Sequence, residues 1–287
     1  MQQANKLSQN SREQTFEFTE TDFKSLREMV LTHTGITLAE HKRDLVYGRL
    51  AKRLRALGLT RFCDYCDLLK NDKNNEIEQF TNAITTNLTS FFREKHHFEH
   101  LAKDIVPALM DSYRVNNRIR IWSAGCSTGE EAYSIAITLR ESIPDIDRRD
   151  IRILATDLDS DVIQTGSSGV YSKTRIEALD SERKKRWFKQ GSGEQKGKVQ
   201  VSPELRKLVT FKQLNLMHEW PMRGKFDVVF CRNVVIYFDK PTQKPLFERF
   251  ANIMRPESTL FIGHSETLNN VSDRFELTGK TVYKKIR

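Results

Sequence analysis

Long apolar segments are absent from this 287-residue chain. No stretch approaches the roughly 18 consecutive apolar residues that a transmembrane helix needs, and the first twenty residues are mostly polar. The sequence therefore predicts neither a membrane span nor a signal peptide, and we expect a cytoplasmic protein. The length allows one large domain or two ordinary ones.

Cysteine is scarce as well. Of the four cysteines, Cys63 and Cys66 form a C-x-x-C pair, but no second pair has matching spacing. A structural zinc site needs four ligands, so we expect these two cysteines to be packing residues and we expect no metal. So few cysteines also suit a reducing compartment.

A phosphate-binding glycine motif of the G-x-G-x-x-G type is missing from the segment that otherwise resembles one. Residues 119–131 read IRIWSAGCSTGEE: an apolar run, then Gly125 and Gly129, then a helical pattern. A second apolar run, residues 151–155, is followed by Asp157. Strand, glycine loop, helix, strand and acid are the layout of a doubly wound nucleotide-type site, in which the acid binds ribose hydroxyls.

The acidic residues of this loop limit the kind of ligand that it can bind. Glu130 and Glu131 at the start of a helix would repel a phosphate and favour a cation. S-adenosylmethionine carries a ribose, a sulfonium and an ammonium group, but no phosphate, so it suits the loop better than a dinucleotide does. The alternative is an ordinary strand–loop–helix crossover whose acidic first turn is solvated, because acids favour helix N-termini anyway.

The periodicity of the chain divides it into two parts. Apolar residues at helical spacing predict helices over residues 22–34, 45–57, 61–69, 77–85 and 96–110, with Thr21 as the first N-cap and Gly58 as a helix stop. Strand patterns fall at residues 119–123, 151–156, 208–213, 226–231, 259–263 and 281–285. Helices alternate with strands in this second part, which is typical of a mostly parallel sheet.

We therefore predict an α/β fold: a doubly wound, mostly parallel sheet with an S-adenosylmethionine-type site, preceded by an all-α domain. The expected divisions are a disordered tail (1–17), a helical domain (18–90), a connecting helix (91–118) and the S-adenosylmethionine-binding α/β domain (119–287). Residues 189–208 interrupt the alternation with glycines, a short VQV run and Pro203. This segment predicts a small inserted antiparallel β-subdomain.

Positive charge is concentrated in one predicted helix. The chain has a net charge of +9, and residues 41–61 hold seven Lys or Arg against one Asp. The polar face of this helix carries Lys42, Arg49, Lys52, Arg53 and Arg55. A basic face without interspersed acids favours an acidic partner, which could be nucleic acid, anionic lipid or an acidic protein surface.

A third pattern, FDVVFCRNVVIYFD at residues 226–239, is typical of a central parallel strand. It ends on Arg232 and Asn233, and Tyr237 follows on the next turn. Ligands of open α/β sheets bind beyond the carboxyl ends of the strands. We therefore expect Asn233 and Tyr237 to share an edge with Gly125 and Asp157, and Asn215, which follows the third strand, to join them.

Four motifs resemble those of the CheR family, the chemotaxis receptor methyltransferases. They are NLTSFFRE (87–94), STGEEAYSIA (127–136), FCRNVVIYFD (230–239) and FIGHSE (261–266), and the resemblance covers nearly the whole chain after residue 18. It implies a fold of the S-adenosylmethionine-dependent methyltransferase type, with a helical N-terminal domain, a methyltransferase domain over residues 119–287 and an inserted three-stranded subdomain. The implied activity is methylation of glutamate γ-carboxylates on receptor signalling helices. One departure is GCSTGE, where the family usually has alanines ahead of STGE; Gly125 and Cys126 are small, so we expect no loss of function.

The resemblance also implies roles for individual residues. Arg93 and Tyr237 would be catalytic, and the basic helix would face the receptor with Arg49, Lys52, Arg53 and Arg55. The cofactor, which leaves as S-adenosylhomocysteine, would be held by Asn87, Thr89, Arg93, Gly125, Glu130, Asp157, Asn215, Leu216, Arg232 and Asn233. The inserted segment around Gly191 and Gly193 would receive a receptor's C-terminal pentapeptide. We expect a monomer, recruited to receptor arrays, that neither binds nucleic acid nor inserts into the membrane.

The chemistry agrees with this assignment. A free glutamate has a pKa of about 4.3, so the nucleophile is already anionic and no general base is required. The sequence offers no His–Asp pair or activated Ser or Cys near the loop. Two alternatives remain: a nucleic-acid methyltransferase, which would need an N/D-P-P-Y type loop where VIYF follows Asn233, and a non-catalytic adaptor, which the intact glycine loop and Asp157 disfavour.

Overall fold

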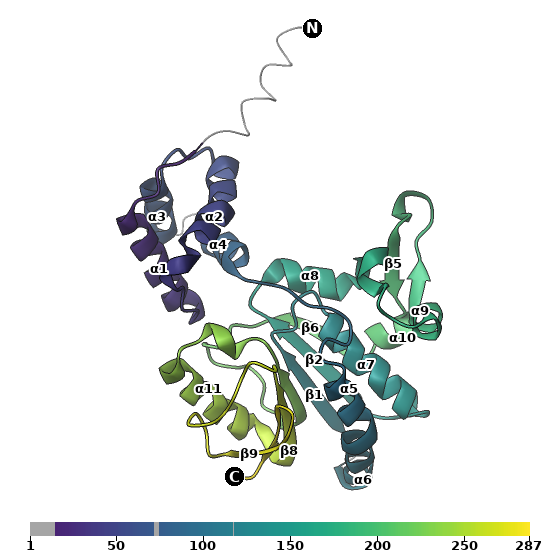
Figure 1. Cartoon of the computed structure of the whole chain (residues 1–287). Coiled ribbons are helices and arrows are strands. Elements are labelled where there is room, and N and C mark those ends of the chain that lie inside the picture. The colour runs from purple at the N-terminus through teal and green to yellow at the C-terminus, as the bar shows by residue number, and fades with distance from the viewer. Residues whose placement is uncertain (1–14, 72–74, 117) are drawn as a thin grey trace. The chain divides into compact units, whose positions relative to one another are not determined.

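The computed structural model of the chain describes residues 15–71, 75–116 and 118–287, which form two compact units (Figure 1). The first unit ends at Thr85 and the second begins at Thr86. Most of the predicted tail, residues 1–14, lies outside the described residues. Within the described residues, no helix is both long enough and apolar enough to span a bilayer.

The first unit is helical, as predicted. Its elements are α1 (Glu20–Thr34), the 3₁₀ helix η1 (Glu40–Lys42), α2 (Arg43–Leu57), α3 (Phe62–Asn71) and α4 (Glu76–Ile84). The N-cap of α1 is Thr19, not Thr21, because Thr19 and Asp22 form a reciprocal capping box. Gly58, at φ 68°, ends α2 in the left-handed conformation as expected.

Aromatic and leucine side chains fill the core of this unit. Phe23, Leu26, Leu50, Phe62 and Phe80 are fully buried, and each contributes roughly 1.5–3 kcal/mol by leaving water. The apolar stripe of each helix therefore faces inward, which is what its sequence period predicts.

The second unit is built on a seven-stranded sheet with the strand order β6-β2-β1-β7-β8-β10-β9. The first five strands in this order are parallel to one another, and β10 and β9 pair antiparallel at the end next to β8. The strands are β1 (Ile119–Ala124), β2 (Ile151–Asp157), β6 (Val209–Gln213), β7 (Phe226–Cys231), β8 (Met254–Ile262), β9 (Phe275–Gly279) and β10 (Val282–Lys285). The mostly parallel, doubly wound sheet is confirmed, and β9 was not predicted.

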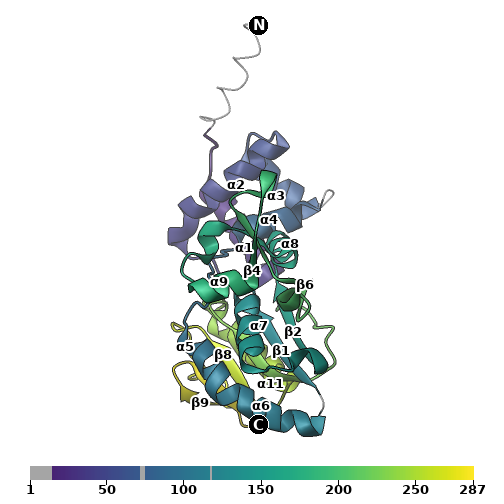
Figure 2. The same ribbon diagram turned by 90° about the vertical axis from the view of Figure 1, so that its right-hand side faces the viewer.

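Helices cover both faces of the sheet (Figures 1 and 2). A continuous helical run, formed by α5 (His96–His100), a π-helical turn (Leu101–Ile105) and α6 (Val106–Asn116), lies on one face with α7 (Glu130–Ser142). On the opposite face lies α11 (Lys240–Ile253). Every residue of β7 is buried, which explains its near-continuous apolar sequence.

A smaller antiparallel sheet with the order β3-β5-β4 confirms the predicted β-subdomain. Its strands are β3 (Val170–Ser172), β4 (Phe188–Gln190) and β5 (Lys198–Val201), so the sheet begins before the expected segment 189–208. Val199 and Val201 of β5 are buried while Lys198 and Gln200 are exposed. This alternation is the VQV pattern seen in the sequence. The remaining short helices of the unit are α8 (Ser160–Ser168), η4 (Lys173–Ile176), α9 (Ser181–Trp187), η5 (Gly193–Gln195) and α10 (Pro203–Arg206).

The order in which strands are added to the sheet reverses between the neighbouring strands β1 and β7. After β1 it continues through α7 to β2 and β6 on one side, whereas after β7 it continues through α11 to β8 on the other. The crevice beyond the carboxyl ends of two such strands is where doubly wound sheets bind ligands.

Candidate active site

The loop between β1 and α7 depends on its glycines. Gly125 and Gly129 have φ of 83° and 96°, a region that residues with side chains rarely adopt. A Cβ on Gly125 would lie 2.3 Å from Cγ2 of Val234, which follows β7. The loops after β1 and β7 therefore touch, and glycine at position 125 permits that contact.

Asp157, the last residue of β2, connects the β1–α7 loop to the loop that follows β2. Its Oδ2 accepts a hydrogen bond from the backbone N–H of Ser127 at 2.7 Å, and its Oδ1 accepts one from that of Asp159 at 3.1 Å. Burial raises the pKa of Asp157 to about 6, although the two backbone N–H groups oppose this shift. Each carboxylate oxygen retains a further lone pair, so Asp157 can still accept hydrogen bonds from hydroxyl groups.

Hydrogen bonds connect the segment 86–90 to the glycine loop and to the residues beside it. The side-chain amide of Asn87 donates to Oδ2 of Asp159 at 2.7 Å, and the backbone carbonyl oxygen of Asn87 accepts from the Ser127 hydroxyl at 2.9 Å. The carbonyl oxygen of Thr89 accepts from Nη1 of Arg175 at 3.2 Å. Asn87, predicted from the family motif, thus lies beside Asp159 and the glycine loop, and Thr89, predicted from the same motif, lies beside Arg175.

Glu130 is fully buried at the first position of α7. Its Oε2 accepts from the Thr128 hydroxyl at 2.6 Å, and its Oε1 pairs with Nη2 of Arg175 at 2.9 Å. Arg175, on η4, was not predicted as a site residue. A buried carboxylate needs such a partner, and here one guanidinium joins the glycine loop, Glu130 and the 86–90 segment.

Arg232, directly after β7, lies between two further acids. Its Nη1 donates to Oε2 of Glu131 at 2.9 Å, and its Nη2 lies 3.2 Å from Oε2 of Glu94 and donates to the carbonyl oxygen of Arg93. Although burial opposes the shift, contacts with His264 and Arg232 lower the pKa of Glu94 to about 2. Glu130 and Glu131 were expected to favour a cationic ligand; the structure shows that each already has an arginine partner.

The turn after β7 is held by a residue that the sequence did not single out. The carboxylate of Glu266 accepts hydrogen bonds from the backbone N–H groups of Asn233 and Val234, both at 2.9 Å, and of Ile236 at 3.2 Å. Asn233 itself has φ 58°. Glu266 therefore stabilises a left-handed turn that presents Asn233 at the carboxyl edge.

Asn215 and Leu216 follow β6 at the same edge. Oδ1 of Asn215 accepts from the backbone N–H of Met217 at 2.9 Å, which closes an Asx-type turn. Leu216 is buried, and its carbonyl oxygen accepts from Nη1 of Arg249 at 2.7 Å. An apolar side chain in a fixed turn is suited to packing against a flat apolar ring.

The two predicted catalytic residues are half-buried. Arg93 donates from Nη1 to the carbonyl oxygen of Leu88 at 2.8 Å, so its side chain folds back over its own loop. Tyr237 is the last residue of the 3₁₀ turn η6 (Val235–Tyr237). Both lie close in sequence to Glu94 and Asn233, and Nδ2 of Asn233 lies 3.5 Å from Oε1 of Glu94.

The predicted receptor-facing residues of α2 fall into two kinds. Arg53 donates two hydrogen bonds to the buried Glu76 at 2.9 and 2.7 Å, and Arg49 donates to the carbonyl oxygens of Ile84 and Thr85 at the end of α4. These two arginines therefore hold the helical unit together.

Lys52 and Arg55, by contrast, are exposed. The Arg55 guanidinium lies 5.4 Å from the centre of the Phe16 ring. These two side chains form the outward basic face of α2.

Gly191 and Gly193 lie in the turn between β4 and β5. A Cβ on Gly191 would lie 2.2 Å from the carbonyl oxygen of Gln195, and Gly193 has φ 57°. The glycines therefore permit a tight hairpin. Among the described residues β4 pairs with β5 alone, so its other edge offers unpaired backbone groups.

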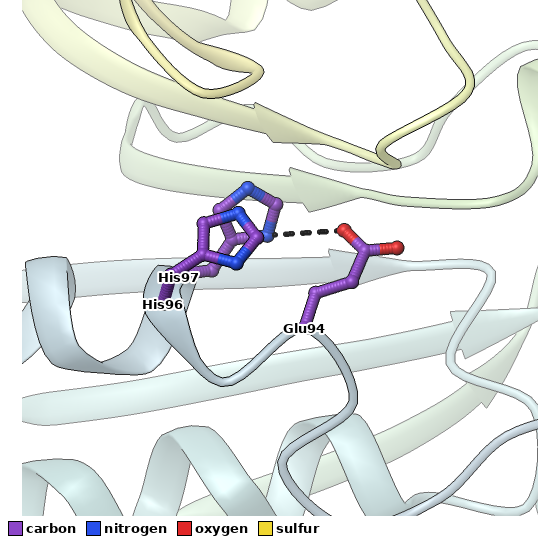
Figure 3. A group of neighbouring side chains, drawn as sticks. All are labelled: Glu94, His96 and His97. Atoms are coloured by element: carbon purple, nitrogen blue, oxygen red, sulfur yellow. Dashed lines mark ion pairs between the residues drawn. The ribbon is translucent and has the colours of Figure 1, made fainter.

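Among the described residues, one group of side chains has the composition and spacing of a metal site: Glu94, His96 and His97 (Figure 3). Burial, assisted by the nearby Arg232, lowers the pKa of His97 to about 4, so its imidazole is neutral at pH 7. None of the four cysteines belongs to this group.

Two known protein-family domains match consecutive parts of the chain. Residues 21–85 match the CheR methyltransferase all-alpha domain, and residues 87–284 match the CheR methyltransferase SAM binding domain. The boundary between the two matches coincides with the boundary between the two structural units.

Several curated relatives are similar over nearly their whole length. Chemotaxis protein methyltransferase 2 of Pseudomonas aeruginosa is 46% identical, covering 94% of this chain and 95% of the relative. The chemotaxis protein methyltransferase of Escherichia coli is 42% identical, covering 91% and 89%. A solved structure, the methyltransferase domain of bacterial CtHen1-C, is a distant match at 14% identity over 56% of this chain and 65% of that chain, with a TM-score of 0.30. The chain belongs to the CheR methyltransferase family, and residues 87–284 are its S-adenosylmethionine-binding domain.

Proposed function

We propose that this methyltransferase of chemotaxis transfers the methyl group of S-adenosylmethionine to glutamate γ-carboxylates on the cytoplasmic helices of chemoreceptors. The chemoreceptor as substrate follows from the relatives, which are chemotaxis protein methyltransferases. The choice of a carboxylate as acceptor rests on the chemistry of the site.

The observation that carries the proposal is that the acids at the carboxyl edge are already engaged. Glu130 pairs with Arg175, Glu131 with Arg232, and Asp157 accepts two backbone N–H groups. An amine acceptor would have to lose a proton to such a base before it could react. A glutamate, with a pKa of about 4.3, is ionised at pH 7 and needs none.

The residues of the edge suit the methyl donor. Asp157 is the acceptor for the ribose hydroxyls, and Leu216 supplies an apolar surface for the adenine. S-adenosylmethionine supplies an electrophilic sulfonium methyl, so the reaction is a single displacement for which no metal is required. Arg175 and Arg232 neutralise Glu130 and Glu131, and this keeps the loop rigid before the donor binds.

Arg93 and Tyr237 position the acceptor in this proposal. Among residues 15–71, 75–116 and 118–287, the Arg93 side chain makes one hydrogen bond, to Leu88, so the rest of its guanidinium can orient the receptor carboxylate. It must not bind the carboxylate too tightly, because a full ion pair lowers nucleophilicity. The hydroxyl of Tyr237 steers the carboxylate or the methyl group. Holding two reactants in line supplies roughly 7–11 kcal/mol.

Two surfaces would recruit the receptor. Lys52 and Arg55 on α2 would complement its acidic methylation helices, and the open edge of β4 would bind a C-terminal pentapeptide as an added strand. The enzyme would act as a cytoplasmic monomer concentrated at receptor arrays. The structural roles of Arg49 and Arg53 weaken the nucleic-acid alternative, because they reduce the charge that the helix can offer to phosphates.

The direct test combines the protein, labelled S-adenosylmethionine and receptor-rich membranes. Methyl esters release volatile methanol in base, whereas methylated amines and bases do not. We expect base-labile label on the receptor, and none on a receptor whose methylation-site glutamates are alanines. Label that resists base, or label on nucleic acid, would overturn the proposal.

A further inference from the structure

One ring nitrogen of the buried His97, Nδ1, faces a carboxylate oxygen of Glu94. The side chain is fully buried, and its Nδ1 lies 3.5 Å from Oε2 of Glu94 (Figure 3). Within the described part of the chain His97 Nδ1 makes no hydrogen bond, and Glu94 Oε2 makes none either but forms an ion pair with Nη2 of Arg232 at 3.2 Å. Buried polar atoms are almost always satisfied, so an unpaired ring nitrogen that faces a carboxylate needs an explanation.

The other ring nitrogen fixes the tautomer of His97. Nε2 lies 3.0 Å from the carbonyl oxygen of Lys280, which can only accept a hydrogen bond. Nε2 therefore carries the proton, and Nδ1 presents a lone pair toward the carboxylate of Glu94. Histidines that bind metals usually donate their second ring N–H to a carbonyl or carboxylate in this manner.

The spacing of the two lone pairs fits a bridging cation. Two ligand atoms bound to one tetrahedral zinc at about 2.0–2.1 Å lie about 3.3–3.4 Å apart, close to the 3.5 Å between His97 Nδ1 and Glu94 Oε2. A ring nitrogen of His96 completes the group, and the three ligand atoms lie within 4.8 Å of one another. We propose that Glu94, His96 and His97 bind a divalent transition-metal ion of the zinc class.

The local backbone and charge are compatible with this site. Phe92 and Glu94 both have left-handed φ, 53° and 57°, which turns Glu94 back toward the start of α5. Such strain costs about 1–3 kcal/mol and is concentrated at functional sites. The opposing charge is Arg232, 3.2 Å from Glu94 Oε2, but its other nitrogen is paired with Glu131. Two carboxylates and one guanidinium leave one net negative charge for the ion.

Metal binding at this site would inhibit the enzyme. Coordination through Oε2 replaces the contact of Glu94 with Arg232, while Oε1 keeps its 2.8 Å contact with His264. Arg232 would then lose one of the two acids that orient it at the cofactor edge. Because methyl transfer itself requires no metal, the ion acts as a reversible inhibitor and not as a cofactor.

Cobalt(II) absorption tests binding without reference to activity. Untagged, chelator-treated protein carrying Cys63→Ser, which removes the exposed thiol, would be titrated with Co²⁺ and then with Zn²⁺. We expect the intense visible bands of low-coordinate cobalt at one ion per chain, and their loss as zinc displaces it. Absence of these bands at millimolar Co²⁺ would overturn the proposal without any further variant.

Two histidine variants locate the site. His96→Gln should weaken Zn²⁺ affinity by about tenfold or more, since loss of an outer-shell partner alone costs about 10–100-fold. The matched control is His100→Gln, on the same helical run, whose Nδ1 pairs with Asp104 at 2.7 Å; it should bind zinc as the parent does. Zinc should slow methyl transfer by the parent, reversibly with chelator, and spare His96→Gln. Equal zinc affinity in the two variants would overturn the assignment.

Discussion

The guanidinium of Arg175 lies 2.9 Å from the fully buried carboxylate of Glu130 and also donates to the carbonyl oxygen of Thr89 at 3.2 Å. One side chain thus joins the first turn of α7 to the segment that covers the glycine loop. Arg175 comes from η4, which directly follows β3, so the inserted sheet and the cofactor edge are physically connected.

Replacing Arg175 with alanine should weaken both the fold and donor binding. It leaves the buried Glu130 without its ion-pair partner, although the Thr128 hydroxyl still donates to it. Urea titrations should therefore show a loss of about 1–3 kcal/mol of unfolding free energy. The apparent KM for S-adenosylmethionine should rise, because the 86–90 segment loses an anchor. Arg175→Lys should recover only part of both, since lysine lacks the planar fork.

The stability loss has an internal control. In the double variant Arg175→Met, Glu130→Gln the uncompensated charge is gone, so stability should return toward that of the parent. If Arg175→Ala unfolded at the parent's urea midpoint, the pairing would be an unimportant surface contact.

Asp157→Ala should weaken donor binding while the fold remains intact. Hydrogen bonds to a charged group contribute about 1.5–3 kcal/mol, so calorimetry should show affinity for S-adenosylmethionine falling on the order of ten- to a hundred-fold. Unchanged affinity in a folded variant would refute the ribose assignment.

The pH dependence of binding checks the same carboxylate. The pKa of Asp157 in the free enzyme is raised to about 6, so the group becomes protonated as the pH falls through that value. A neutral carboxyl is the poorer acceptor, and the parent should therefore lose affinity between pH 7 and pH 5. Asp157→Ala should show a shallower decline over the same interval.

Arg93→Ala should reduce turnover far more than donor affinity. Misplaced reactants cost on the order of a hundred-fold in rate, whereas the guanidinium is proposed to act on the receptor carboxylate. A matched control is Arg152→Ala, which removes an exposed arginine whose Nη1 also donates to a backbone carbonyl, that of Ile151 at 2.8 Å. Wild-type turnover by Arg93→Ala at saturating receptor would reassign Arg93 to the surface.

Reversing the outward charge of α2 should abolish receptor methylation and leave donor affinity unchanged. The structure selects Lys52→Glu with Arg55→Glu, because replacing Arg49 or Arg53 would disturb contacts within the helical unit. The effect should weaken with salt, since exposed charges are screened beyond about 10 Å at 0.1 M.

A control variant changes the charge of the same unit equally. Lys24→Glu with Lys70→Glu places the reversals on α1 and α3, at exposed positions. If both double variants methylated receptor equally, the face of α2 would have no special role in recruitment.

A receptor tail peptide should bind the open edge of β4 with micromolar affinity. Main-chain hydrogen bonds along the edge supply most of this affinity, so backbone N-methylation of the peptide should remove it even though the side chains are kept. The docking raises local receptor concentration without altering the chemistry. No binding at millimolar peptide would mean that the enzyme works untethered.

Periodicity predicted most of the fold because most elements bury a clear stripe. The edge strand β9 was not predicted, because only its first residue, Phe275, is buried and its sequence FELTG shows no alternation of apolar and polar residues. The start of α1 was misplaced by two residues because both Thr19 and Thr21 are acceptable caps, and the reciprocal contact with Asp22 decides between them.

The motifs predicted residues that lie at strand ends, but not their partners. Arg175 acts on the side chain of Thr128, 47 positions away, and Glu266 on the backbone of Asn233, 33 positions away. Such contacts form only when the sheet brings distant loops together, and no local pattern records them. FIGHSE contains Glu266, but only the structure shows that its carboxylate holds the turn after β7.

Peptide mapping of the methylated receptor by mass spectrometry identifies the methylated atom directly. We predict methyl groups on glutamate side chains of the cytoplasmic helices, present with the parent enzyme and strongly reduced with Arg93→Ala at saturating donor. Methyl groups on lysine, arginine or a nucleobase, or equal glutamate methylation by the two enzymes, would contradict this prediction.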